Sequence, residues 1–157
     1  MISNATPLIC LARIQQLELL KKLFTTIIIP KEVKEEILID DKPGQYHLMN
    51  AFDAGFIHVL NPKKLILLGL GKGETAAISL AREKNDMILL DDATATRAAN
   101  ALNISTLRTT TVLFLAIQKE IITKKEALVL FNKLIENVYY ISPRYYDIIV
   151  EKLHAQT

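Results

Sequence analysis

The chain has 157 residues, of which half are apolar and 23% are charged, and this balance excludes disordered and fibrous proteins. The formal net charge of +2 is too small to indicate nucleic-acid binding by itself. The single cysteine, Cys10, precludes an internal disulfide and fits a reducing compartment. The length predicts one domain over residues 1–157. Because no apolar run reaches membrane length and no signal segment is seen, we expect a cytoplasmic protein without a membrane partner.

Apolar runs and helical periodicity alternate along the chain. A strand end at 1–3 turns into a helix at Asn4-Ala5-Thr6-Pro7, where the polar residues can cap and the proline fits the first turn. Short apolar or β-branched runs predict further strands at 25–29, 56–60, 87–90, 104–107 and 138–141. Helical spacing predicts helices at 7–12, 15–23, 30–40, 45–54, 75–82, 93–101, 109–118, 124–135 and 145–153.

The clearest strands are continuously apolar instead of alternating between apolar and polar residues. Such strands are buried on both faces, which is typical of parallel sheets covered by helices on each side. We therefore predict an α/β fold, a three-layer α/β/α sandwich around a mostly parallel sheet of four to five strands.

Three acidic residues flank the helix and strand of the stretch 69–92. Asp91 and Asp92 follow the strand predicted at 87–90, at the sheet edge where open α/β sheets bind ligands, and Glu74 stands at a helix start. Clustered carboxylates hold hard divalent cations. Each residue alone also has an ordinary explanation, since Glu74 suits the helix dipole and Asp92 suits the cap of helix 93–101. Two adjacent aspartates exceed what one cap requires, and this favours a site.

Other motifs are weaker. The sequence GLGKGE lacks the lysine–serine/threonine ending of a phosphate-binding loop, and its glycines do not follow a convincing strand as in a dinucleotide loop. The histidines have no partners at zinc-binding spacing: they are His47, His58 and His154. Four tyrosines gather near the C-terminus, where a core edge or a protein interface is a more frequent role than base stacking: Tyr139, Tyr140, Tyr145 and Tyr146.

Five motifs in order resemble the PIN-domain family, metal-dependent ribonucleases that include VapC-like toxins. The resemblance is to a poorly characterised prokaryotic subgroup with an N-x-[ST]-P-L-I opening, and it covers nearly the whole chain. The motifs are ISNATPLICLARI, IIIPKEVKEEI, GKGETAAISLA, ILLDDATATRAA and STLRTTTVLFLA.

The resemblance implies a metal-dependent endoribonuclease, the toxin of a toxin–antitoxin pair, with RNA as substrate and a cognate antitoxin as partner. It implies one or two Mg or Mn ions, which would activate a water for attack on phosphate. The implied catalytic acids, which with Asn4 would also bind the metal, are Glu36, Glu74, Asp91 and Asp92. The implied substrate-binding residues are Thr6, Arg97, Arg108 and Thr109. Strand alternation points Asp91 and Asp92 to opposite sides, so we expect only one of them to contact the metal directly.

Two departures from the family pattern keep a second function open. Asn4 stands where active PIN nucleases carry an aspartate, and the usually glycine-rich turn after the last core strand reads RTTT at 108–111. The alternative is thus a catalytically weak or inactive PIN-fold binding protein. A nucleotide-binding signalling domain of flavodoxin-like topology ranks behind, because no phosphate loop is present. Apolar residues of the early helices, Leu17, Leu20 and Leu23, suit either burial against the sheet or a homodimer face.

Overall fold

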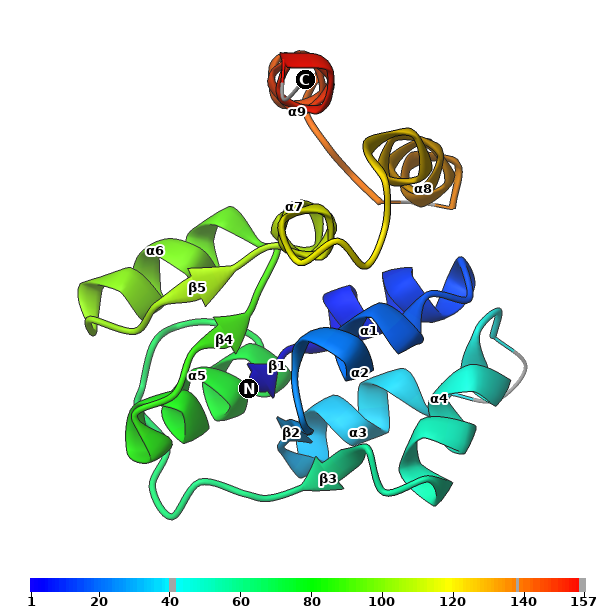
Figure 1. Ribbon diagram of the computed structural model, residues 1–157. Coiled ribbons are helices and arrows are strands. Elements are labelled where there is room, and N and C mark those ends of the chain that lie inside the picture. Colours follow the sequence, from blue (N-terminus) through cyan, green and yellow to red (C-terminus); the bar gives the residue numbers. More distant parts are fainter. Residues whose placement is uncertain (40–41, 138, 156–157) are drawn as a thin grey trace.

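A five-stranded parallel sheet forms the centre of the protein, whose computed structural model describes residues 1–39, 42–137 and 139–155 (Figure 1). The strand order is β3-β2-β1-β4-β5, and all neighbouring strands pair in parallel, as in Ile2 opposite Ile88. The strands are β1 (Ile2–Ser3), β2 (Ile27–Ile29), β3 (Ile57–Val59), β4 (Ile88–Leu89) and β5 (Thr106–Leu107). The predicted α/β class with a mostly parallel sheet is confirmed.

Helices cover both faces of this sheet. They are α1 (Ala5–Arg13), α2 (Leu17–Leu23), α3 (Lys31–Ile37), α4 (Gln45–Asp53), α5 (Lys72–Lys84), α6 (Ala93–Ala101), α7 (Thr109–Gln118), α8 (Lys124–Glu136) and α9 (Pro143–Ala155). In Figure 1, α1 and α2 lie on one side of β1 and α5 lies on the other. Helix α7 packs on α1 and α2, and α8 and α9 follow outward from it (Figure 1).

The central strands are largely apolar because helices cover both of their faces, whereas His58 and Val59 of the edge strand β3 are exposed. Ile2, Ile27 and Ile88 are fully buried between the helical layers. Alanines of α5 let this helix approach the sheet closely, and Ala76 and Ala77 are fully buried. The result is a rigid scaffold whose strand ends present the loops that follow them.

The structure corrects four of the predicted elements. Helix α2 begins at Leu17 because Gln15 has a left-handed backbone with φ of 57°. Helix α5 begins three residues before 75, because Glu74 accepts a hydrogen bond from the Gly71 amide and caps the first turn. The strand predicted at 138–141 is wrong over 139–141, which has no strand pairing, and position 138 lies outside the described residues. The helix predicted at 30–40 ends at Ile37, with position 40 also outside them.

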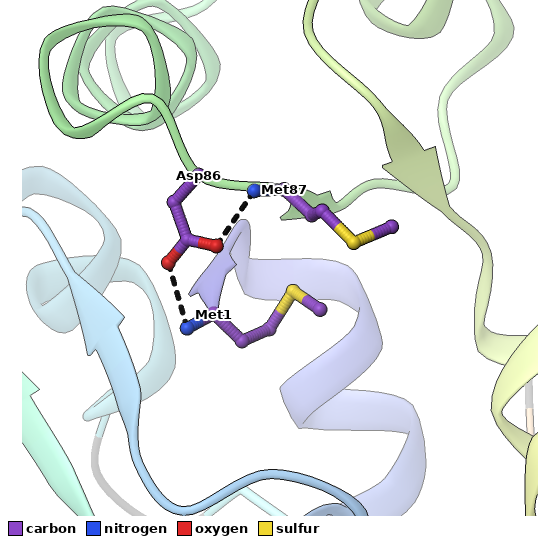
Figure 2. A network of polar contacts seen from close by, with 3 residues as sticks. All are labelled: Met1, Asp86 and Met87. Atoms are coloured by element: carbon purple, nitrogen blue, oxygen red, sulfur yellow. Dashed lines mark hydrogen bonds and ion pairs between the residues drawn. The ribbon is translucent and has the colours of Figure 1, made fainter.

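The amino ends of β1 and β4 are joined by one carboxylate. Asp86 accepts an ion pair from the Met1 amino group at 2.8 Å and a hydrogen bond from the Met87 amide at 2.7 Å (Figure 2). The ion pair links the two strands at the sheet edge opposite the one where their carboxyl ends meet. Among the described helices, none combines the length and apolar character that crossing a membrane requires.

Candidate active site

The strand order changes direction at β1, because β2 and β3 lie on one side of it and β4 and β5 on the other. Open α/β sheets bind ligands at the carboxyl edge of such a switch point. Here a pocket of about 440 Å³ opens at the ends of β1, β4 and β5. Its lining residues are Thr6, Asp91, Asp92, Ala93, Arg108, Tyr139, Tyr140, Ile141, Ser142 and Tyr145.

Asp91 is held by hydrogen bonds from two segments distant in sequence. Its carboxylate accepts from the Thr109 amide at 2.9 Å, the Thr109 hydroxyl at 2.6 Å and the Tyr139 hydroxyl at 2.8 Å. Burial raises the pKa of Asp91, while the hydrogen bonds from Thr109 and Tyr139 and the charge of Arg108 act to lower it. The same burial, followed by the negative charge of Asp91, raises the pKa of the Tyr139 hydroxyl. Three donors therefore occupy this carboxylate and fix its orientation.

Asp92 is exposed and caps the next helix. One carboxylate oxygen accepts from the Ala95 amide at 2.7 Å, so the predicted cap of α6 is confirmed. The second oxygen makes no hydrogen bond or ion pair within the described part of the chain. Asp92 is therefore the freer of the two aspartates and can offer an oxygen to a ligand.

Glu36 and Glu74 lie together where α3 packs on the first turn of α5. The carboxylate of Glu36 occupies the space beside Gly73, where a Cβ atom would overlap it. Desolvation and then the negative charge of Glu74 raise the pKa of Glu36. Neither carboxylate forms an ion pair with any described lysine, arginine or histidine. Two like charges are thus held side by side without a compensating cation.

Asn4 follows β1 and is only 5% exposed. Its backbone amide donates to the Leu89 carbonyl at 3.0 Å, which ties it to β4. Its side-chain oxygen is buried and has no hydrogen-bond partner among the described residues. An orphaned buried oxygen is costly unless a ligand satisfies it. Asn4 lies between β1 and α1, whereas Glu36 and Glu74 lie on α3 and α5. These elements pack on one another, since α3 contacts α1 and α5, and α5 contacts β1.

The expected single cluster of four acids is not what the structure has. Glu36 and Glu74 form one pair, while Asp91 and Asp92 line the pocket. Within residues 1–39, 42–137 and 139–155, no three His, Cys, Asp or Glu side chains are placed to share a metal ion. The donor chemistry nevertheless suits a hard divalent cation, because two uncompensated carboxylates and an orphaned amide oxygen are available.

The predicted substrate-binding residues divide in the same way. Thr6 and Arg108 line the pocket, and Thr109 is buried beneath it as a donor to Asp91. Arg97 was expected beside the aspartates, but it is exposed on α6, donates to Thr94 on its own helix and does not line the pocket. Arg97 lies in the middle of α6, six residues after Asp91, and the helix carries it away from the pocket.

Sequence reasoning missed the tyrosines of this pocket. Tyr139 binds Asp91, and the Tyr145 hydroxyl lies 3.1 Å from the Thr110 hydroxyl. The guanidinium of Arg108 lies over the Tyr145 ring, 5.1 Å from its centroid. The clustering of tyrosines near the C-terminus was a usable signal. It carried no information on which part of the fold they approach.

Comparisons with known proteins found a family and a similar solved structure. A family model described as a PIN domain, DUF3368, matches residues 1–155. A solved structure of a PilT N-terminus domain protein from the hyperthermophilic archaeon Sulfolobus solfataricus P2 matches with 15% sequence identity and a TM-score of 0.45. The match covers 74% of this chain and 94% of that one. No curated protein matches the chain.

Proposed function

The chain belongs to the PIN-domain family, whose members are typically nucleases that act on RNA, and from this we propose that it is a Mg- or Mn-dependent endoribonuclease. The observation that carries the metal requirement is the Glu36–Glu74 pair, in which like charges adjoin without a cation. A bound divalent ion would offset their repulsion, lower the pKa of a bound water and stabilise negative charge on the phosphate.

The residues of the site take different roles in this proposal. Glu36 and Glu74 supply the charge that holds an ion, and Asn4 supplies a neutral oxygen from its buried amide. Asp92 contributes its unbonded carboxylate oxygen from the pocket side. Asp91 acts as a positioning residue, because its three hydrogen bonds fix the turn that carries Arg108 and Thr109.

RNA would approach over the pocket at the ends of β4 and β5. Arg108 and Thr6 line this pocket, where Arg108 would bind a phosphate of the backbone and Thr6 would offer a hydroxyl. Arg97 lies outside the pocket, so we assign it no contact with the scissile phosphate.

We extend the proposal to a toxin–antitoxin pair. An antitoxin that places an arginine or lysine beside the Glu36–Glu74 pair would compensate its charge and block the metal. Among the early leucines, Leu17 and Leu20 are buried, so they serve the core and do not form a homodimer face. A homodimer through another surface stays a prediction.

One observation favours the second function, a catalytically weak binding protein. Asn4 provides no charge where active family members carry an aspartate. Among the described residues, no three His, Cys, Asp or Glu side chains are placed to share a metal ion. Such a protein would bind divalent ions poorly and gain no stability from them.

Thermal melts with millimolar Mn or with EDTA separate the two functions. We expect Mn to raise the melting temperature of the wild type, and Glu36→Gln and Glu74→Gln to remove that rise and reduce cleavage of single-stranded RNA at least about tenfold. Glu74→Gln should leave the fold intact, because the glutamine oxygen can still accept the capping hydrogen bond. Asp92→Asn tests the remaining ligand in the same way, because asparagine is also a good helix cap. Glu35→Gln, on the same helix as Glu36, is the matched control and should behave as wild type.

The opposite results would support the binding protein. A wild type that neither gains stability with Mn nor cleaves RNA would contradict the ribonuclease. Cleavage retained in both glutamate variants would show that the chemistry lies elsewhere.

A further inference from the structure

Tyr140 is the one tyrosine of the pocket that the fold itself does not use. Tyr139 is buried against Asp91, and Tyr145 packs under Arg108. The Tyr140 ring is 93% exposed and makes no hydrogen bond or ring contact within the described part of the chain. A large aromatic face left in water at the rim of a pocket is a surface on which a flat ligand can stack.

The backbone around Tyr140 is fixed on both sides. The Tyr139 amide donates to the Leu134 carbonyl at 2.9 Å, and its hydroxyl reaches Asp91. On the other side, the Tyr146 amide donates to the Ser142 carbonyl at 2.9 Å as α9 begins. The exposed ring is therefore displayed on a short, anchored segment, and little order would have to be gained when a ligand stacks on it.

Arg108 supplies the charge that a nucleotide would need beside this ring. Its guanidinium is held over the Tyr145 ring, and the Tyr145 hydroxyl is itself held near Thr110. Arg108 forms no ion pair with any described carboxylate, so its donors are free for a phosphate. The pocket thus presents an aromatic face, a fixed cation and the free oxygen of Asp92 around one opening.

We propose that Tyr140 is the residue of this pocket that stacks on an RNA base while Arg108 binds the adjoining phosphate. The inference rests on the proposed ribonuclease function and adds the residue that holds a base of its substrate. Bases in a duplex are stacked on one another and cannot offer a face to a tyrosine, whereas unpaired bases can. Every base has such a face, so the contact does not depend on the base sequence.

The test compares Tyr140→Ala and Tyr140→Phe, both in the Glu74→Gln background, in which slower cleavage lets RNA binding be measured. Binding of a labelled single-stranded RNA oligonucleotide is followed by fluorescence anisotropy, and the matched duplex is measured in parallel. We expect Tyr140→Ala to weaken single-strand binding about tenfold and Tyr140→Phe to bind as the parent, because the ring face makes the contact. Tyr46→Ala is the control, since Tyr46 is 71% exposed on α4 and does not line the pocket.

In the cleaving protein, Tyr140→Ala should raise KM and leave the melting temperature and its response to Mn unchanged. Parent-like RNA binding by Tyr140→Ala, with cleavage intact, would overturn the stacking inference and leave the ribonuclease standing. An equal loss in Tyr140→Phe, or a parent protein that prefers the duplex, would also overturn it. Loss of a protein partner without any change in RNA binding would make Tyr140 a protein contact and overturn it. A wild type that neither binds nor cleaves RNA would instead contradict the proposed function.

Discussion

Asp91 and the Glu36–Glu74 pair are acidic sites built in opposite ways. Asp91 lies in a partly buried pocket wall where Thr109 and Tyr139 supply three hydrogen bonds to one carboxylate. Glu36 has a second carboxylate as its neighbour, and no described cation pairs with either glutamate. The first site is complete within the chain, while the second lacks its counter-charge.

This contrast separates acids that hold the fold from acids that await a ligand. A satisfied carboxylate contributes to stability through its donors, and removing it leaves those donors unpaired. A like-charge pair costs stability in the folded chain, so a sequence retains it when something outside the chain compensates the charge. Substitutions at the two sites should therefore change stability in opposite directions.

Asp91→Ala should give the largest effect. It leaves the Thr109 amide and hydroxyl and the Tyr139 hydroxyl without their acceptor, and we expect a loss of about 3 kcal/mol in the free energy of unfolding. Urea denaturation measures this directly. Asp92→Ala is the control, because it removes only the cap of α6 and should cost about 1 kcal/mol. Equal losses of unfolding free energy in the two variants would mean that Asp91 stabilises the fold no more than an exposed helix cap does.

Tyr139→Phe should give a smaller loss in the same direction. It removes one hydrogen bond to the buried Asp91 carboxyl group, which corresponds to about 1.5 kcal/mol in the free energy of unfolding. Tyr140→Phe, one residue along, removes a hydroxyl that faces solvent and should leave stability unchanged. If both variants unfold at the same urea concentration as the wild type, the C-terminal segment does not stabilise Asp91.

Much of the fold could be predicted because its signals are local. The β-branched run before α3 and the apolar run before Asp91 mark strands, and helices α6 and α7 begin and end where apolar spacing predicted them. The order of strands and helices then places Asn4, Asp91 and Arg108 at one edge of the sheet. No property of the separate segments had to be known beyond their type and order.

The failures come from contacts between distant segments. The run at 138–141 has strand-like composition, but Tyr139 is placed by a hydrogen bond to Asp91, 48 residues earlier. Likewise, the sequence puts Glu36 and Glu74 on separate helices, and only the packing of α3 on α5 brings them together beside Gly73. Side-chain direction after a strand depends on such packing, so sequence alone could not tell which aspartate is enclosed.

Glu36→Gln should change stability least and in the opposite direction. The pKa of Glu36 is raised in the folded chain by desolvation and by the charge of Glu74. Between its unfolded and folded pKa values, the folded chain binds more protons at this carboxyl, so stability falls as pH rises through that range. At neutral pH without metal, the neutral amide should therefore give a small rise in melting temperature over the wild type. Below the unfolded pKa, where the carboxyl is protonated in both states, this gain should vanish.

Glu35→Gln is the matched control for this pH dependence, because Glu35 is exposed and its 3.5 Å ion pair with Lys31 is a surface contact. Its melting temperature should follow that of the wild type at every pH. Millimolar Mn should then reverse the order, because the wild type gains an ion that Glu36→Gln cannot hold. A Glu36→Gln variant less stable than wild type at neutral pH in EDTA would show that this carboxylate is satisfied within the chain. The distinction from Asp91 would then fail.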